Sequence, residues 1–339
     1  MTVLLLLLLV AVLLGPFVFS FAERQLELYL FTLGICAVMT AGIWSRTLFF
    51  TVITDPIAIT CAVLIAGLLF RVFQQPFSKS IGFAERHVPS RIFVALMVIT
   101  IGLVSSFITA IIAAILLVSI ISLLHYDRRT QIRLVIISCY SIGLGAVLTP
   151  LGEPLSTIAT SRLDESFFYL FSLLGSDVLI AIVSLGFIAG IVIQPSALKR
   201  RVNKKLEKES LRAISIRSVK VYIFVMALTL LGAGFEPLLS PILEGKSPAF
   251  LYWANMISAV LDNATLASIE LSSSMDETTI RAILMGLLIS GGMLIPGNIP
   301  NIIAAGKLSV TSKEWARFGF PFGLLAMIIY FFMVVYWQE

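Results

Sequence analysis

The sequence predicts an all-α protein that crosses a membrane several times. Hydrophobic residues make up 59% of the 339 residues and charged residues only 13%, and the mean hydropathy is +1.03. So little polar surface could not coat a soluble domain of this size. The apolar residues also gather in runs near the length of roughly 20 residues that a membrane-spanning helix needs. These runs cover residues 2–21, 28–43, 56–70, 134–149, 178–193, 221–235, 279–294 and 319–337.

The first run, residues 2–21, has no Lys or Arg before its apolar core and no clear small-residue cleavage site. We therefore expect it to remain as a helix rather than to act as a signal peptide. Asp55 precedes Pro56 at the start of the third run. We interpret this aspartate either as a helix cap at the external surface or as a third functional site.

Two further apolar regions are each interrupted by polar residues. Residues 91–124 are too long for one helix and contain "SSFIT" at 105–109, and residues 250–271 contain "LDN" at 261–263. We predict that each region is a re-entrant helical hairpin, in which two short helices meet at a polar tip inside the membrane. Non-helical backbone at that depth is tolerated only where it is buried in protein or lines a wet cavity.

Basic residues predict the orientation. Residues 199–220 contain nine Lys and Arg residues but only two Glu residues, and such segments are typically cytoplasmic. If the predicted spans are counted in both directions from this segment, residues 71–91 and 125–133 also lie on the cytoplasmic side, and both chain termini lie outside. The first hairpin then enters from the cytoplasm and the second from outside, so the two are predicted to be inverted relative to each other.

A comparison of the chain with itself supports two repeats. "SSFITAIIAA" from Ser105 aligns without gaps with "SAVLDNATLA" from Ser258, and "GEPLST" from Gly152 aligns with "GNIPNI" from Gly297. Paired interruptions at matching places indicate a transporter binding site near the bilayer midplane. We divide the chain into N-terminal helices that resemble a scaffold (1–90), a first repeat (91–193), a basic cytoplasmic linker (194–220) and a second repeat (221–339).

The segments "TPLGEP" and "IPGNIPN" contain residues that interrupt a helix. Proline cannot continue helical hydrogen bonding, and glycine permits a turn. Carbonyl groups before each break are expected to be free to bind cations, and the restarting helix exposes N–H groups that favour anions. The residues expected to break the helices are Pro150, Gly152, Pro154, Pro296, Gly297 and Pro300.

The polar residues at the tips and breaks form a predicted ion site. Glu153 indicates that the bound ion is positively charged, because a carboxylate attracts a cation or a proton. Asp262 adds a second carboxylate, and the pair would have coupled, raised pKa values, so that cation and proton compete. The oxygen ligands suit a hard cation such as sodium, held by Glu153, Asp262, Asn263 and Asn298. The full expected set is Ser105, Ser106, Thr109, Glu153, Ser156, Thr157, Asp262, Asn263, Thr265, Asn298 and Asn301.

Several of these polar residues could have structural roles instead of functional ones. Asp262 could simply cap the helix at Thr265, and the hydroxyl groups at the tips could simply satisfy backbone groups. Glu236 and Glu270 lie near predicted segment ends, where they could reach the interface. His87 and His125 fall in predicted cytoplasmic loops, so we expect no imidazole ligand.

These motifs resemble the ion transporter superfamily, which includes bacterial sodium/proton antiporters and arsenite permeases. Within it, residues 91–339 are most similar to a small family of predicted cation transporters first described as a domain of unknown function. "LDN" resembles the hairpin tip of the antiporters and arsenite permeases, and "GEP" stands where the antiporters place a glycine and an acidic residue. The resemblance implies that Asp262, Asn263 and Glu153 bind ions and couple protons. It also implies a homodimer with an elevator-like movement.

We expect a secondary transporter in the cell membrane, most simply a Na⁺/H⁺ antiporter that needs no cofactor. The alternative is an anion or metalloid carrier of the same fold, for arsenite or a carboxylate, coupled to protons or sodium. A carboxylate substrate is disfavoured, because neither hairpin tip contains the Ser-Asn-Thr signature of the superfamily's dicarboxylate carriers. The sequence has no HExxH or GxSxG motif that would indicate an enzyme. Its net charge of +5 reflects topology rather than nucleic-acid binding, so we expect the partners to be ions and membrane lipid.

Overall fold

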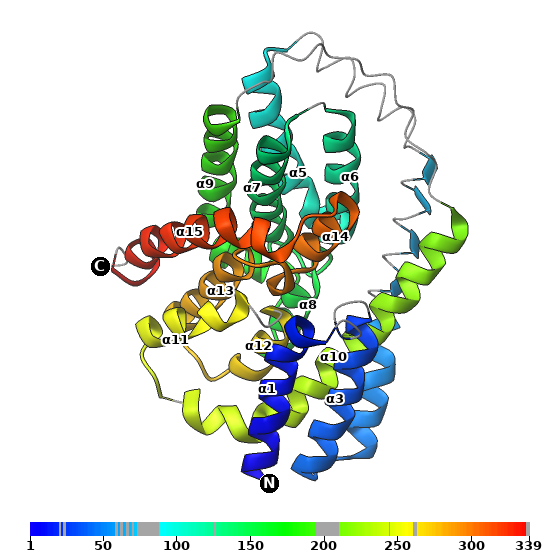
Figure 1. Ribbon diagram of the computed structural model, residues 1–339. Helices are drawn as coiled ribbons and strands as arrows, with labels where there is room; N and C mark the ends of the chain where they lie inside the picture. Colours follow the sequence, from blue (N-terminus) through cyan, green and yellow to red (C-terminus); the bar gives the residue numbers. More distant parts are fainter. Residues whose placement is uncertain are drawn as a thin grey trace.

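The fold is known from a computed structural model, and its described part is helical throughout (Figure 1). The structure describes residues 1–19, 22, 25–57, 60–61, 64–65, 68–69, 71–72, 88–124, 126–193, 210–243, 245–259 and 263–336. Within these residues, four helical stretches are long and apolar enough to cross a membrane: Ser90–Ile108, Tyr169–Val192, Leu211–Leu239 and Ser312–Val334. Together they indicate a helical membrane protein.

One group of helices combines the N-terminus with the middle of the chain. It contains α1 (Thr2–Val18), α3 (Leu26–Ala41), a helix over residues 46–57, and α10 (Leu211–Leu243). α3 and α10 pack closely because glycines face the partner helix: a Cβ atom on Gly34 would lie 2.8 Å from Leu230 Cβ, and one on Gly234 would lie 2.6 Å from Ala37 Cβ. In Figure 1 this N-terminal group lies in the lower part of the molecule, which α10 crosses obliquely from the right-hand side.

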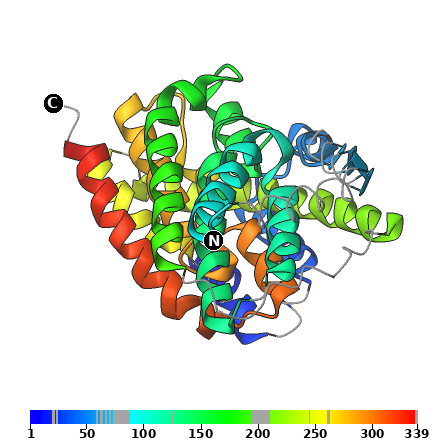
Figure 2. The same ribbon diagram turned by 90° about the horizontal axis from the view of Figure 1, so that it is seen from above.

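The remaining helices form the body of the molecule, in which α11–α15 follow α5–α9 in a similar order. Figure 2 places α15 along one edge of the molecule and the start of α10 at the opposite edge. The bounds are α5 Ser90–Ile108, α6 Ala110–Leu123, α7 Arg128–Ala146, α8 Pro154–Leu163, α9 Tyr169–Val192, α11 Pro248–Ala254, η1 Asn255–Ala259, α12 Asn263–Glu270, α13 Glu277–Gly291, η2 Ile295–Gly297, α14 Ile299–Leu308, α15 Ser312–Phe331 and η3 Phe332–Tyr336.

α7 and α13 occupy the centre of the body. Every residue of α7 from Leu134 to Ala146 is buried, and α13 is almost as fully enclosed from Thr279 to Gly291. By contrast, α9 exposes large apolar side chains such as Phe187 and Ile191 along its outer face, as expected for a helix that faces lipid. The interruptions that follow α7 and α13 therefore begin inside the molecule.

Three features differ from the sequence predictions. α10 begins at Leu211, inside the segment expected as a linker, because Ile214 is buried there and Lys220 forms an ion pair with Glu27. Residues 46–57 are helical through Asp55, which is therefore not a helix cap. α5 has 19 residues, enough to span a bilayer, and so is longer than the expected hairpin helix.

Candidate functional site

α7 and α13 each lead to an interruption of similar construction. Both start at an aspartate N-cap: the Asp127 carboxylate accepts a hydrogen bond from the Thr130 amide, and that of Asp276 from the Thr279 amide, both at 3.1 Å. Hydrogen bonds from these threonines lower the pKa of both aspartates. α7 ends at Ala146 and α13 at Gly291. We call residues 147–153 the first break and residues 292–298 the second break.

A short helix of 10 residues follows each break. α8 starts after its N-cap Glu153 with φ −155° and ψ 164°, and α14 starts after its N-cap Asn298 with φ −152° and ψ 144°. Each has a proline in its first two positions, where the missing N–H group costs nothing. Both helices end at a left-handed residue, Asp164 with φ 55° and Ser309 with φ 52°. The chain therefore builds the same local structure twice.

Glycines allow the breaks to fold tightly. A Cβ atom on Gly152 would collide with the carbonyl oxygen of Ala146, and one on Gly297 would lie 2.6 Å from the carbonyl oxygen of Ser258. The close approach of backbone, rather than an unusual φ angle, therefore requires glycine at both places. Gly297 also places the second break directly against η1.

The first hairpin tip lies on the first break. α5 ends and α6 begins at Thr109, which has a φ of 70°, a strained conformation for a β-branched residue. The Ala110 amide donates to the Gly152 carbonyl at 2.7 Å, and the Thr149 hydroxyl donates to the Ser106 carbonyl at 2.5 Å. The predicted interruption at "SSFIT" is confirmed, and it contacts the break of its own half.

The tip hydroxyl groups mainly serve the backbone. Ser105 Oγ lies within hydrogen-bond distance of the Gly102 and Ile142 carbonyls, at 2.6 and 2.9 Å, which share its single proton, and Ser106 Oγ donates to the Leu103 carbonyl at 2.7 Å. In α8, Ser156 Oγ lies 2.7 Å from the Glu153 carbonyl, and Thr157 Oγ1 lies 2.6 Å from the Pro150 carbonyl. Each hydroxyl thus has a structural partner, as the alternative interpretation anticipated.

The second tip is only partly described. η1 ends at Ala259 and α12 begins at Asn263, so the chain changes helix where the alignment with Thr109 and Ala110 predicted. Residues 260–262, and with them Asp262, lie outside the described residues, as does the side chain of Thr265. Asn263 is buried, and its Nδ2 atom has no hydrogen-bond partner among the described residues.

The two halves interlock through the short helices. α14 of the second half packs on α6 and α7 of the first, and α8 of the first half packs on α12 of the second. Cys139 of α7 lies 3.7 Å from the Pro300 carbonyl, and a Cβ atom on Gly143 would lie 2.6 Å from Asn298 Nδ2. The side chain of Asn298 is therefore seated against α7, at the junction of the halves.

Several carbonyl groups that the sequence predicted to be free are partly occupied. In the first break, the Thr149 carbonyl accepts from the Gly152 amide at 3.0 Å and the Pro150 carbonyl accepts from Thr157. Next to the second break, Asn301 Nδ2 donates to the Gly291 and Leu294 carbonyls, both at 2.9 Å. Asn301 Oδ1 is buried and has no partner among the described residues, which makes it the best-defined candidate ligand oxygen.

Glu153 places a carboxylate at the first break. Its residue is only 6% exposed, and with Ser156 it forms a reciprocal capping box at the start of α8. Within the described residues, no three His, Cys, Asp or Glu side chains lie close enough together to hold a metal ion. Glu153 thus brings one buried carboxylate to the start of α8.

A polar cavity of about 570 Å³ separates the N-terminal group from α8 and α12. Thr157, one turn after Glu153, lines it from α8, and Asp55 lines it from the opposite side. Arg162 and Glu236 form an ion pair across it, with Nη2 and Oε2 3.4 Å apart. The cavity thus lies between α8 and the N-terminal group, and it comes within one turn of the first break at Thr157.

Sequence reasoning missed two buried charged groups. Glu270, expected at the interface, is only 6% exposed and accepts a hydrogen bond from Asn255 Nδ2 at 2.9 Å. Asp177 of α9 pairs with Arg281 of α13, whose Nε donates at 2.7 Å. The available signal was a carboxylate inside an apolar run, as at Glu153. The partners could not be identified because they are distant in sequence.

A comparison with known families finds one match that covers nearly the whole chain. A family model with the description Protein of unknown function (DUF1646) matches residues 2–337. A search of curated proteins finds no match.

Proposed function

The chain belongs to the family described as Protein of unknown function (DUF1646), and we propose that it is a secondary active transporter of an inorganic cation. The proposed reaction is Na⁺/H⁺ antiport by alternating access. Sodium and protons would compete for Glu153 and Asp262, with Asn263, Asn298 and Asn301 as further sodium ligands.

The observation that carries this proposal is the pair of matched breaks, of which one bears a buried carboxylate. Both breaks follow buried helices, and the ion sites of transporters typically lie where such interruptions of the two halves meet. A carboxylate buried at such a place attracts a cation or a proton, since either one offsets its charge. Alternation between these two partners is the chemistry of an antiporter.

We propose further that the two halves are inverted repeats with re-entrant hairpins. The reciprocal packing of α6 on α14 and of α8 on α12 supports this proposal, since a two-fold relation between halves requires contacts in such pairs. The equal lengths and matching caps of α8 and α14 support it as well.

The proposed movement is elevator-like and would occur in a homodimer of the cell membrane. In it, the body would slide against the N-terminal group, which includes α3 and α10. The cavity between α8 and these helices supports this division, because it would bring an ion to Thr157, one turn after Glu153. Asp55 would provide a negative charge along that approach, since Glu236 is paired with Arg162 there.

Transport by purified protein in vesicles tests the proposal. Vesicles that hold a pH-sensitive dye and a pH gradient would receive sodium, potassium, lithium, magnesium or calcium salts in turn. We expect sodium to dissipate the gradient with the wild type and with Glu165→Gln, a matched control at an exposed glutamate just after α8. Glu153→Gln should show only the leak of protein-free vesicles.

Two results would oppose the proposal. If no cation moves protons, the coupling is wrong, and arsenite and carboxylates become the substrates to test. If Glu153→Gln transports as the wild type does, Glu153 is a helix cap alone and the acidic centre lies elsewhere.

A further inference from the structure

A basic pocket lies at the start of α7, at the turn between α14 and α15. It has a volume of about 610 Å³. Four arginines and one glutamate line it together with two apolar residues, and the set is Arg128, Arg129, Ile132, Arg133, Glu314, Arg317 and Phe318. The charged groups give this lining a net charge of +3 at neutral pH.

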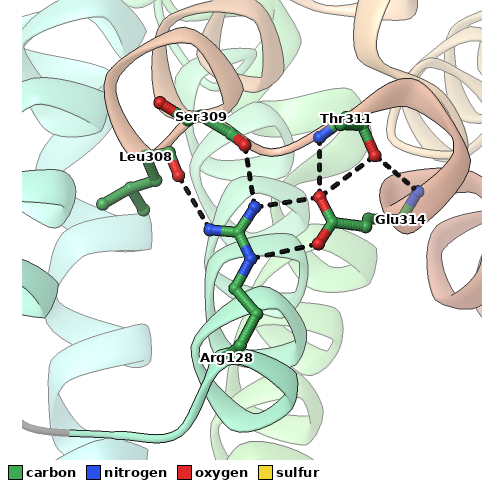
Figure 3. A network of polar contacts seen from close by, with 5 residues as sticks. All are labelled: Arg128, Leu308, Ser309, Thr311 and Glu314. Carbon is green, nitrogen blue, oxygen red and sulfur yellow. Dashed lines mark hydrogen bonds and ion pairs between the residues drawn. The ribbon is translucent and has the colours of Figure 1, made fainter.

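Arg128 and Glu314 neutralise each other within this set (Figure 3). Arg128 Nε donates to Glu314 Oε1 at 3.1 Å and Nη2 donates to Oε2 at 2.9 Å, so the pair is bidentate. Arg128 also donates to the carbonyls of Leu308 and Ser309, at 2.8 and 2.7 Å. The guanidinium group thus fixes the turn between α14 and α15, and it is not free to bind a ligand.

The other three arginines retain their binding capacity. Within the part of the chain that the structure describes, no carboxylate pairs with Arg129, Arg133 or Arg317. Arg133 stacks on the Phe318 ring, with its Cζ atom 5.7 Å from the ring centroid. This contact positions the guanidinium plane but consumes none of its N–H donors. Three planar donors around one pocket suit a phosphate oxyanion.

The position of the pocket indicates where such an anion comes from. α15 is a candidate membrane span that starts at Ser312, so Arg317 and Phe318 lie in its first two turns. Ile132 and Phe318 give the same pocket an apolar wall. A charged end beside an apolar wall at the end of a span fits the headgroup and upper acyl chain of a lipid better than a soluble anion.

We propose that this pocket binds the phosphate headgroup of an anionic phospholipid, at Arg129, Arg133 and Arg317. The bound lipid would bridge the start of α7 in the first half and the start of α15 in the second. It would thereby reinforce the contact that Arg128 and Glu314 already make. This inference is independent of the proposed transport function, since none of the three arginines lies at the breaks.

Native mass spectrometry of the full-length protein in detergent tests the lipid site. Phosphatidylglycerol and phosphatidylcholine with the same acyl chains would be added in equal amounts. We expect the wild type to retain phosphatidylglycerol preferentially, and each arginine removed to weaken retention about fivefold. Arg129→Gln/Arg133→Gln/Arg317→Gln should lose the preference. Arg46→Gln/Arg91→Gln/Lys246→Gln, which removes three exposed charges elsewhere, should keep it.

Further variants and ligands test whether the anion is a lipid headgroup or a soluble phosphate, and whether a lost preference reflects misfolding. A triple Arg→Lys variant at the three positions keeps the charge and should retain part of the preference. Equal retention of both lipids by the wild type would overturn the proposal. Binding of inorganic phosphate that abolishes lipid retention at equal concentration would assign the pocket to a soluble anion instead. An unchanged lipid preference in the triple Gln variant would place the lipid elsewhere.

Discussion

The first and second breaks share their shape and differ in their charge. Both follow a central helix, fold around a glycine and restart a helix of 10 residues whose N-cap is almost fully extended. The N-cap is Glu153 in one and Asn298 in the other. Backbone geometry therefore depends on the glycine and proline positions, whereas the chemistry depends on one side chain. Two breaks that are built alike thus differ in whether their N-cap carries a carboxylate.

The largest effect is expected when the first break is given the cap of the second. Glu153→Asn keeps a good N-cap residue and so should preserve the fold, with a stability change of about 1 kcal/mol or less. Because it removes the charge, proton flux driven by sodium should fall to the level of protein-free vesicles. Flux assays and thermal unfolding of the same sample would separate the two effects. Flux at the wild-type level would show that charge at the first break is dispensable.

The two halves also differ in the ion pairs that connect them. Asp177 of α9 pairs with Arg281 of α13, and Glu314 of α15 pairs with Arg128 of α7. In each pair, an arginine before a break meets an acid on the closing helix of the other half. The first pair is mostly buried, with side chains 7% and 18% exposed, whereas the second is 34% and 43% exposed. Corresponding pairs of helices are thus joined once inside the protein and once at its surface, although the residues do not occupy equivalent positions.

Breaking the buried pair should strongly destabilise the protein. Asp177→Asn leaves the Arg281 guanidinium without its counter-charge, and such changes cost about 3 kcal/mol. Thermal unfolding should show a large decrease in Tm. Adding Arg281→Gln to this variant should recover part of the loss, because no unpaired charge then remains. A double variant as unstable as the sum of both single variants would argue against direct coupling.

The glycines of the breaks test whether the shared shape has a shared cause. Gly152→Ala and Gly297→Ala should each cost about 1–3 kcal/mol, because the added methyl group meets backbone atoms that cannot yield easily. Gly306→Ala is the matched control, since no atom lies within 4 Å of an added Cβ there and the residue is inside α14. It should be neutral or stabilising. Equal Tm values for all three variants would contradict the steric explanation.

Local signals predicted the breaks, but not the contacts around them. Proline and glycine restrict only their own backbone, so "TPLGEP" and "IPGNIPN" could be located from sequence. The partner of Glu270 could not, because Asn255 belongs to another helix and meets it only after the chain has folded. The same holds for Asp177 and Arg281, which are 104 residues apart. Orientation in the membrane and ion identity stay predictions, since both depend on partners outside the chain.

The smallest effect is expected at the exposed ion pair. Glu314→Gln keeps the capping box with Thr311, because glutamine can replace glutamate at that position. Arg128 also keeps its hydrogen bonds to the Leu308 and Ser309 carbonyls. The charge is lost together with one of the two hydrogen bonds from Arg128, because glutamine has a single side-chain oxygen. Charge pairs at the surface contribute little and are screened by salt. The Tm difference from the wild type should therefore be much smaller than for Asp177→Asn.

Salt dependence distinguishes the two ion pairs. The Tm difference caused by Glu314→Gln should disappear when salt is raised to about 1 M, where electrostatic interactions are screened within about 3 Å. The difference caused by Asp177→Asn should persist, because burial shields that pair from dissolved ions. If salt removes both differences equally, the pairs are equivalent in solution and the contrast in burial has no energetic consequence. If neither responds, Glu314 acts through the capping box, and the two halves are joined chiefly by the buried pair.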